Sequence, residues 1–284
     1  MSLIAYVNGE FLPIESATVH IEDRGFQFAD GVYEVVACYD GRFFELNAHL
    51  QRLQRSCESI QLPLPFSLER MESIVRETYT LNNLDDAMVY IQVTRGVAPR
   101  IHMPAGALTP TLVVTVRPLP EVDEEKALFG AHAITLADIR WKRCDIKSIA
   151  LLASVLAKQE AMHRGAHEAF WTNEQRHVLE GSSTNILAVI NGTLTTHPQD
   201  HQILGGITRD LALRLAREHD IPTEERPWCL DEPGLSECMM SSTTNAVLPV
   251  VRIDDMPIAD EQPGPVTKQL RELLLHEISA MCSS

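Results

Sequence analysis

Hydrophobic positions in the first part of the chain alternate with polar ones in short runs, and turn-forming pairs interrupt two of these runs. Asn8-Gly9 divides the run over residues 3–14, and Asp40-Gly41 divides the run over residues 31–46. An Asn-Gly or Asp-Gly pair between alternating segments is typical of a tight β-hairpin turn. The pattern therefore predicts two hairpins near the start of the chain.

Two stretches with hydrophobic residues every three or four positions follow, which is the period of an amphipathic helix. We predict helices over residues 47–60 and 67–82, the first with Asn47 as its N-cap. The predicted buried face of the first helix carries Leu50, Leu53, Cys57 and Ile60. Arg52 lies off this face, which makes a surface position its simplest interpretation.

A change in composition marks an expected domain boundary. The β-rich runs at residues 86–96 and 111–119 enclose a loop rich in proline and glycine. Residues 119–126, which follow, contain a proline and an acidic cluster, as linkers often do. We therefore expect an N-terminal domain at residues 1–118 and a C-terminal domain at residues 127–284.

Strands and helices continue beyond the expected linker without a regular β-α-β order. The pattern predicts β structure at residues 131–141, 166–197 and 237–253, and helices just after Lys147, over 205–221 and over 264–280. This mixture of hairpins and helices favours the α+β class over a doubly wound sheet. The glycine fingerprints of dinucleotide-binding folds and of phosphate-binding loops are absent from the sequence.

Composition and charge exclude several classes of partner. The net charge of the 284 residues is −15, which argues against nucleic acid and against an anionic membrane surface. Six cysteines are scattered without metal-binding spacing, so we expect no metal and a cytoplasmic location. We see no signal peptide, and no apolar run approaches the ~18 residues of a membrane span.

Lys147 is the first candidate for chemistry, because it stands between Ile146 and Ser148 where an apolar run begins. A lysine near a helix start most often reaches into solvent along its own stem. A lysine held in a cleft instead loses its proton more easily and can form a Schiff base with a carbonyl. The lysine alone does not decide between these two interpretations.

Three polar turns add further candidates in the second half. Residues 204–210 offer the amides of Ile207 and Thr208 at a helix start, which suits an anion such as phosphate, although Thr208 could equally be an ordinary cap. Residues 241–245 form a turn rich in hydroxyl groups. Glu180 ends a β run and is either an exposed turn residue or a carboxylate that holds a protonated ring nitrogen.

The first half contributes candidates for binding a carboxylate. Arg100 and His102 are two residues apart, so in an extended loop both side chains would point the same way. Together they could clamp a carboxylate, and two solvated loop residues are the simpler alternative. Tyr33 could be a core residue with its hydroxyl at the rim.

The order of these motifs resembles one known family. The segments "DRGFQFADGVYEVV", "HLQRL", "VTRGVAPRIH", "RCDIKS", "EGSSTN", "GITRD" and "SSTTN" follow one another as in the fold type IV pyridoxal-phosphate enzymes. The resemblance spans residues 3–280 and is greatest to the D-amino-acid (D-alanine) transaminases. One departure is Ala29, where the pattern has glycine.

The resemblance implies a role for each matching residue. Lys147 would form the Schiff base with pyridoxal 5'-phosphate and move the proton, in a cleft between the two domains. Glu180 would pair with the pyridine nitrogen. The phosphate would be held by Arg52, Ile207, Thr208, Ser242 and Thr243. The substrate carboxylate would be held by Tyr33, Arg100 and His102.

The implied activity is ping-pong transfer of an amino group between a D-amino acid such as D-alanine and a 2-oxo acid such as 2-oxoglutarate, in a homodimer. Alternatives within the same fold are a branched-chain L-amino-acid transaminase, an (R)-amine transaminase and an aminodeoxychorismate lyase. A protein that binds the cofactor without turnover is an alternative of a different class.

Overall fold

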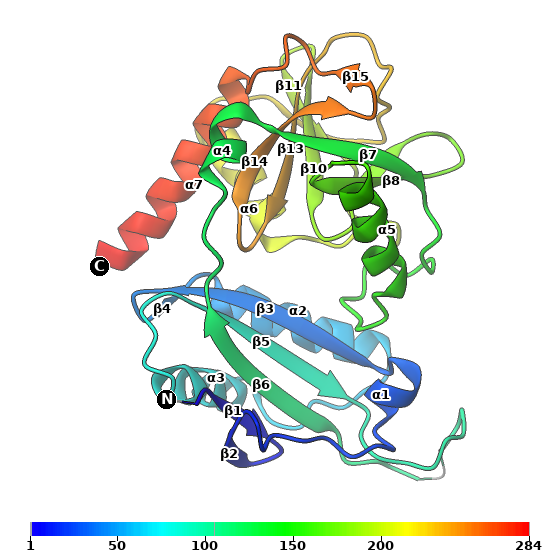
Figure 1. The fold of residues 1–284 in the computed structure, drawn as a ribbon, viewed down its shortest axis with the longest axis vertical. Helices are drawn as coiled ribbons and strands as arrows, with labels where there is room; N and C mark the ends of the chain where they lie inside the picture. The colour runs from blue at the N-terminus through cyan, green and yellow to red at the C-terminus, as the bar shows by residue number, and fades with distance from the viewer. Residues whose placement is uncertain (1, 105, 284) are drawn as a thin grey trace. The chain divides into compact units, whose positions relative to one another are not determined.

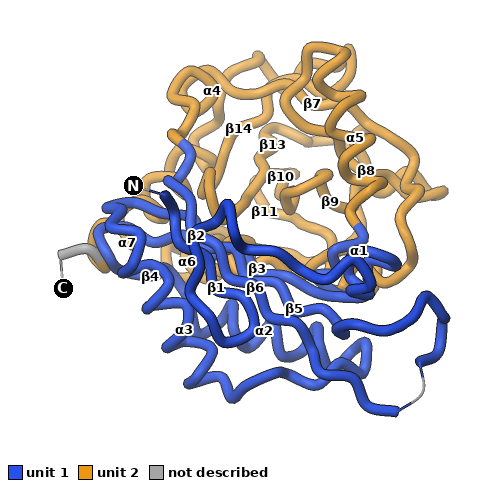
Figure 2. The backbone as a smooth tube through the Cα atoms, turned by 60° about the horizontal axis from the view of Figure 1, so that its bottom comes forward, with its two compact units in different colours: residues 1–120, 146–150, 284 blue, residues 121–145, 151–283 orange. Residues whose placement is uncertain are grey.

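The computed structural model describes residues 2–104 and 106–283, and its contacts divide the chain into two compact units. The first unit comprises residues up to Pro120 together with 146–150, and the second comprises 121–145 and 151–283 (Figure 2). This division differs from the expected one in two ways. The first unit ends at Pro120 with no separate linker over residues 119–126, and residues 146–150, which include Lys147, group with the first unit instead of the second.

The first unit is an antiparallel sheet covered by helices (Figure 1). The strand order is β2-β1-β6-β5-β3-β4. Its elements are β1 (Ile4–Val7), β2 (Glu10–Pro13), α1 (Arg24–Phe28), β3 (Gly31–Tyr39), β4 (Arg42–Phe43), α2 (Leu46–Ser59), α3 (Leu68–Thr80), β5 (Ala87–Thr94) and β6 (Thr111–Pro118). Both predicted hairpins are confirmed, since Val7 pairs with Glu10 and Tyr39 pairs with Arg42.

The core of the first unit lies between its sheet and the helices α2 and α3. Helix α2 packs on β3, and α3 packs on β1, β5 and β6. Leu50, Leu53 and Cys57 are buried as predicted. The predicted cap was wrong, because α2 begins one residue earlier and its N-cap is Glu45, which makes no side-chain capping hydrogen bond.

The second unit is built on a mixed nine-stranded sheet. Its main path runs β12-β11-β10-β13-β14-β7-β8-β9, with β15 beside β14 and a further pairing of β10 with β9. The elements are α4 (Glu124–Phe129), β7 (Ala131–Ala137), α5 (Leu152–His163), β8 (Glu168–Thr172), β9 (Val178–Gly181), β10 (Asn185–Ile190), β11 (Thr193–Thr196), α6 (Ile207–Glu218), β12 (Thr223–Glu225), β13 (Leu235–Ser242), β14 (Ala246–Ile253), β15 (Met256–Pro257) and α7 (Pro265–Ser283).

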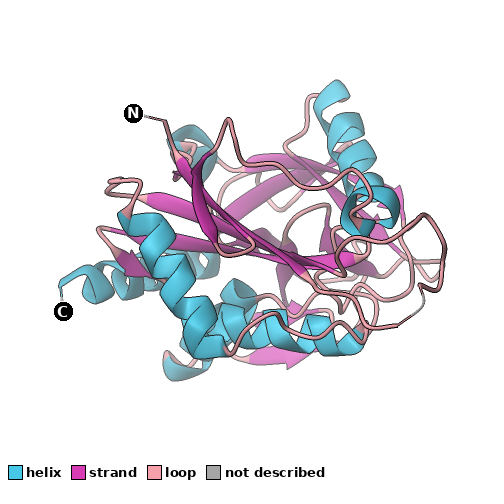
Figure 3. Cartoon of the chain, turned by 90° about the horizontal axis from the view of Figure 1, so that it is seen from below, coloured by secondary structure: helices cyan, strands magenta, loops and turns pink. Residues whose placement is uncertain are grey.

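Helices pack against this second sheet and against one another. Helix α5 contacts β7 and β8, whereas α6 and α7 contact each other and both contact β13. Each unit therefore mixes helices with a largely antiparallel sheet, which confirms the α+β class (Figure 3). Within the described residues, no helix combines the length and the apolar character that crossing a bilayer requires.

Candidate active site

Lys147 lies beside β3 of the first unit, where the next residue, Ser148, forms an isolated β-bridge with Val32. Its carbonyl accepts a hydrogen bond from the amide of Tyr33 at 2.9 Å, and the amide of Ile149 donates to the carbonyl of Gly31 at 3.1 Å. The amide of Lys147 donates to the Ser56 hydroxyl at 3.3 Å. Its Nζ is 4.6 Å from the centre of the Tyr33 ring. The half-buried lysine is thus held against β3, five residues before α5 begins.

Arg52 is buried next to a carboxylate in the first unit, so a surface position was the wrong interpretation for it. Its Nε and Nη2 donate to the two oxygens of Glu34, both at 2.8 Å, and His49 Nδ1 lies 2.7 Å from Glu34 Oε2. Burial raises the pKa of Glu34, but the hydrogen bonds and charges of Arg52 and His49 outweigh it and lower the pKa to about 2. The first unit therefore contains a fixed ionised carboxylate in front of the proposed phosphate ligand.

Arg100 and His102 meet at one aromatic ring. The Arg100 guanidinium carbon is 5.0 Å from the centre of the Phe28 ring, and the His102 ring centre is 5.6 Å from it. Both residues are exposed and belong to the loop between β5 and β6. The structure therefore brings the two predicted clamp residues together, as expected from their spacing. The third predicted substrate ligand, Tyr33, has its ring next to Lys147 Nζ. The same ring stacks on Tyr90 with 5.6 Å between the ring centres.

Glu180 ends strand β9 in the second unit, and a network of donors holds its carboxylate. Oε1 accepts a hydrogen bond from Arg140, and Oε2 accepts from the amide of Leu204 at 2.9 Å and from Asn185 Nδ2 at 3.3 Å. Burial lowers the pKa of Arg140, but its hydrogen bonds to Asp138 and the charge of Glu180 raise it overall. Arg140 is therefore a permanent cation beside Glu180, and the simpler interpretation of Glu180 as an exposed turn residue is wrong.

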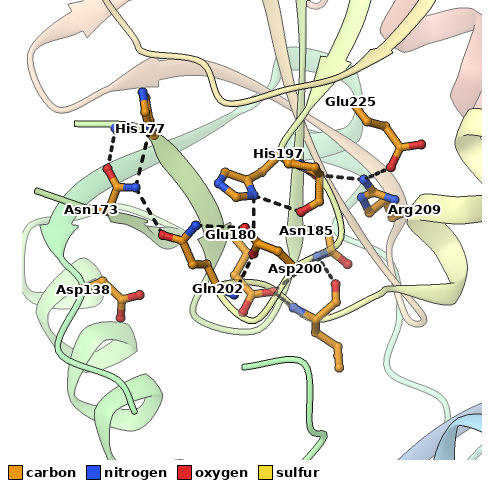
Figure 4. A network of polar contacts seen from close by, with 12 residues as sticks. Asp138, Asn173, His177, Glu180, Asn185, His197, Asp200, Gln202, Arg209 and Glu225 are labelled. Atoms are coloured by element: carbon orange, nitrogen blue, oxygen red, sulfur yellow. Dashed lines mark hydrogen bonds and ion pairs between the residues drawn. The ribbon is translucent and has the colours of Figure 1, made fainter. Parts of the chain in front are cut away.

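The loop between β11 and α6 contacts the side chains that hold Glu180 (Figure 4). Asp200 accepts hydrogen bonds from the amide and the side chain of Gln202 at 2.7 and 2.9 Å. The carbonyl of Gln202 accepts from Arg140 at 3.0 Å, and the carbonyl of Leu204 accepts from Asn185 at 2.8 Å. Arg140 and Asn185 thus bind both this loop and the Glu180 carboxylate.

The N-terminus of α6 has the backbone of an anion site. Its N-cap is Gly206, which has no side chain to occupy the first amides, so the alternative of Thr208 as the cap was wrong. A Cβ at Gly206 would lie 1.8 Å from Asn185 Oδ1, so a side chain there would displace Asn185 from Glu180 and from the Leu204 carbonyl. Thr208 is buried in the first turn, and Ile207 is the residue before it.

The strand register places Asn185 between Glu180 and the end of β13. Asn185 of β10 pairs with Glu180 of β9 on one side and with Ser241 of β13 on the other. Ser242 is the next residue, and its hydroxyl accepts a hydrogen bond from the amide of Asn245 at 3.2 Å. Asn185 thus lies beside Glu180 and Gly206, and its partner Ser241 directly precedes Ser242 and Thr243 in the chain.

Comparison with known proteins decides the family. The family model described as "Amino-transferase class IV" matches residues 31–253. The D-alanine aminotransferase of Staphylococcus haemolyticus is 40% identical over 273 residues, which is 94% of this chain and 95% of that protein. That of Listeria monocytogenes serotype 1/2a (strain 10403S) is 40% identical over 280 residues, 97% of this chain and 96% of the relative. The chain belongs to the class IV aminotransferases.

A solved structure supports this placement of the chain among the class IV aminotransferases. The branched-chain amino acid aminotransferase of T.th. with pyridoxamine 5'-phosphate superposes with a TM-score of 0.90 at 26% identity. The match covers 99% of this chain and 95% of that one. The chain is thus an aminotransferase of the pyridoxal-phosphate-dependent kind, and the fold class expected from the sequence is confirmed.

The residues present suit the cofactor of a class IV aminotransferase. A phosphate needs amide donors and hydroxyls, which the start of α6, with no side-chain cap, and the hydroxyls of Thr208 and Ser242 would supply. A protonated pyridine nitrogen needs a fixed carboxylate, which Glu180 would supply. Within the described residues, no cluster of three or more His, Cys, Asp or Glu side chains could hold a metal ion.

Two supporting side chains of this class IV aminotransferase were missed in the sequence, Arg140 and Asn185. Asn185 closes the quoted motif "EGSSTN", and Arg140 stands in the predicted strand "AHAITLADIRW", seven residues before Lys147. The fixed spacing of Asn185 from Glu180 could have found the first. Arg140 has no such signal, because it approaches Glu180 only through the pairing of β7, β8 and β9.

Proposed function

We propose that this chain transfers an amino group between a D-amino acid such as D-alanine and a 2-oxo acid such as 2-oxoglutarate, by a ping-pong mechanism. The observation that carries this proposal is the meeting of Arg100 and His102 at Phe28. A cation and an imidazole on one exposed loop suit a substrate carboxylate. The names of the curated relatives support the same choice of substrate.

The cofactor would be held by residues of both units. The phosphate would bind the amides of Ile207 and Thr208, the hydroxyls of Thr208, Ser242 and Thr243, and Arg52 from the first unit. Glu180 would bind the ring nitrogen, and Lys147 would hold the carbonyl carbon.

When bound, pyridoxal phosphate supplies the electron sink that makes the Cα–H bond of an amino acid acidic. The protein supplies position and proton transfer. Glu180 would keep a proton on the ring nitrogen, because Arg140 and the Leu204 amide hold the carboxylate in place. Lys147 would take the proton from Cα of the substrate and deliver it to C4′ of the cofactor.

The stereochemistry follows from which pocket receives the carboxylate. Lys147 takes a proton from one side only, so exchanging the carboxylate pocket with the side-chain pocket selects the opposite enantiomer. Arg100 and His102 would fix the carboxylate so that the Cα–H of a D-amino acid faces Lys147, with Tyr33 as a third contact. A branched-chain L-amino-acid or (R)-amine transaminase would need a different use of this loop.

A coupled assay tests the proposed substrates. The purified protein should convert D-alanine with 2-oxoglutarate and should be far slower with L-leucine. A preference for L-leucine would support the branched-chain alternative. Release of pyruvate from 4-amino-4-deoxychorismate would support the lyase, and failure with every amine donor would leave a cofactor-binding protein without turnover.

Lys147→Ala tests the cofactor site. Borohydride reduction of the wild type should leave a phosphopyridoxyl group on Lys147, found by peptide mapping. Lys147→Ala should still bind the cofactor through the phosphate ligands and should show negligible transfer. Lys158→Ala is the matched control, because that lysine lies on α5 and donates to the carbonyl of His167. A reduced adduct on Lys142 or Lys158 would overturn the assignment.

We further propose that the enzyme is a cytoplasmic homodimer. Helix α5 exposes four large hydrophobic side chains, Leu152, Val155, Leu156 and Met162, which a second copy could cover. Five cysteines, Cys38, Cys57, Cys144, Cys229 and Cys238, are free thiols, which suits a reducing compartment. Light scattering of the purified protein should give twice the chain mass, and Leu152→Glu together with Leu156→Glu should reduce it to one chain.

A further inference from the structure

One quoted motif has no role in the proposed mechanism, the segment "DRGFQFADG". Arg24 is the first residue of α1, and its side chain is only 6% exposed. Its Nε donates to Asp30 Oδ2 at 2.8 Å. Its two terminal nitrogens donate to the carbonyl of Ile101 at 2.6 Å and to the carbonyl of His102 at 3.0 Å. One buried guanidinium therefore binds the backbone of the loop between β5 and β6 at two consecutive residues. This loop carries Arg100 and His102 and is called the clamp loop below.

Arg24 is itself fixed by the end of the sheet. Its amide donates to the carbonyl of Gly96 at 2.9 Å. Asp23, the residue before it, accepts from the amide of Gly25 at 2.8 Å and from the Thr94 hydroxyl at 3.0 Å. A Cβ at Gly25 would lie 2.3 Å from a Thr94 methyl carbon. The start of α1 is therefore locked against the end of β5.

The charge of Arg24 is balanced within the same group. Asp30 also accepts two hydrogen bonds from Arg95 Nε, at 3.0 and 2.9 Å. Burial raises the pKa of Asp30, but the hydrogen bonds of Arg95 and Arg24 lower it overall. Arg95 in turn donates to the carbonyls of Ile60 and Gln61, beyond α2. Arg24 is thus paired with the ionised Asp30, and Arg95 connects Asp30 to the end of α2.

The same arginine shares an aromatic ring with the clamp. The Arg24 guanidinium carbon is 4.9 Å from the centre of the Phe28 ring, and Arg100 and His102 contact that same ring. The loop itself is exposed at Arg100, Ile101, His102 and Met103. In the described part of the chain, the two bonds from Arg24 are the only hydrogen bonds that tie residues 100–104 to other segments.

We propose that Arg24 is a positioning residue for the substrate carboxylate: by binding the carbonyls of Ile101 and His102 and packing on Phe28, it holds Arg100 and His102 in the geometry that clamps the carboxylate. This inference rests on the proposed function of Arg100 and His102. Arg24 need not touch the substrate, because it acts through the loop. A loop that must be ordered by the substrate binds it more weakly.

The test compares Arg24→Lys and Arg24→Met in the holoenzyme with Arg76→Met as matched control. Lysine keeps the charge beside Asp30 but cannot reach two carbonyls as a fork does. Arg76 also lies on an aromatic ring, 5.1 Å from the centre of Phe43, but pairs with exposed Glu72 and is remote from the loop in the sequence. Melting curves establish whether each variant is folded. If Arg24→Met does not fold, the comparison is made with Arg24→Lys alone.

Trypsin reports on the loop without any reference to activity. Cleavage after Arg100 should be about tenfold faster in both Arg24 variants than in the wild type and in Arg76→Met. Arg100→Gln removes this site and identifies the fragment. The KM for D-alanine and for 2-oxoglutarate should rise roughly 5- to 100-fold, with kcat changed far less and with no rise for an amine that lacks a carboxylate.

The outcomes separate this inference from the function on which it rests. Unchanged cleavage and unchanged KM in both variants, with D-alanine turned over by the wild type, would overturn the role of Arg24 and leave the proposed function standing. An equal loss for the amine without a carboxylate would also overturn it, since the defect would then be general. Faster cleavage in an enzyme that ignores D-alanine would keep the positioning role and sink the proposed substrate.

Discussion

Glu180 in the second unit and the Arg100–His102 pair in the first are supported in opposite ways. Glu180 is 7% exposed, and both of its oxygens accept hydrogen bonds from Arg140, Asn185 or the backbone of Leu204. Arg100 and His102 are exposed, and the fixed donor of Arg24 binds the loop backbone instead of their side chains. Glu180 is held at its functional side-chain oxygens, whereas Arg100 and His102 are held through the backbone of their loop.

This difference matches what each site would do. A carboxylate that serves the cofactor acts in every half-reaction, so its position must be fixed before any substrate arrives. Side chains that select the substrate are suited to a loop, because the sequence of a loop can change without disturbing the sheet that carries it. The two regions therefore separate chemistry from selection, and the predictions below test that separation from the largest effect to the smallest.

Glu180→Gln should lower turnover by roughly 10- to 150-fold, since a hydrogen bond to a charged group contributes about 1.5–3 kcal/mol. The loss should be the same for D-alanine and for an amine without a carboxylate. Glutamine brings an NH2 group against Arg140 or the Leu204 amide, so cofactor content must be measured beside the rate.

Glu174→Gln is the matched control, because Glu174 is exposed in the turn before β9. It should leave both rates unchanged. If Glu180→Gln retained its cofactor and the full rate with every donor, Glu180 would be a structural residue and the contrast between the two regions would disappear.

Arg100→Ala should lower kcat/KM for D-alanine by about 30-fold, the result of losing about 2 kcal/mol. That is the lower end of the cost for a lost charge partner, because Arg100 is exposed in the chain and water screens it. A carboxylate-free amine should be nearly indifferent to the change. The measurement is kcat/KM for both donors in Arg100→Ala and in Arg117→Ala, which removes an exposed arginine from β6. An equal loss for the two donors would contradict the clamp.

Local sequence signals predicted the elements of this fold well. The hairpins at Asn8-Gly9 and Asp40-Gly41 follow from turn chemistry, and the buried faces of α2 and α3 follow from helical spacing. Ala29, the departure noted in the sequence, has φ +54°, the left-handed region that glycine enters without strain. The backbone thus explains why the pattern has glycine at this position.

Signals that depend on pairing across the chain were not visible. Arg52 looked like a surface residue because its partner, Glu34, lies on a strand 18 positions earlier. Lys147 was assigned to the C-terminal domain because it follows the linker, whereas its backbone forms hydrogen bonds with Tyr33 and Ser56. Helical and strand periods report which face is buried, but they do not report which polar side chains meet inside it.

His102→Ala should have the smallest effect, a loss of roughly 2- to 10-fold in kcat/KM for D-alanine, because an imidazole adds one hydrogen bond of about 0.5–1.5 kcal/mol. His102→Gln should recover part of that loss, since an amide can donate the same bond. His163→Ala, at the exposed end of α5, is the control and should behave as the wild type. The sharper measurement is the double variant with Arg100→Ala. If both side chains hold one carboxylate, the two losses should not add, because neighbours that share a partner are coupled. Strictly additive losses would mean that His102 serves Phe28 and the loop, and that Arg100 alone selects the substrate.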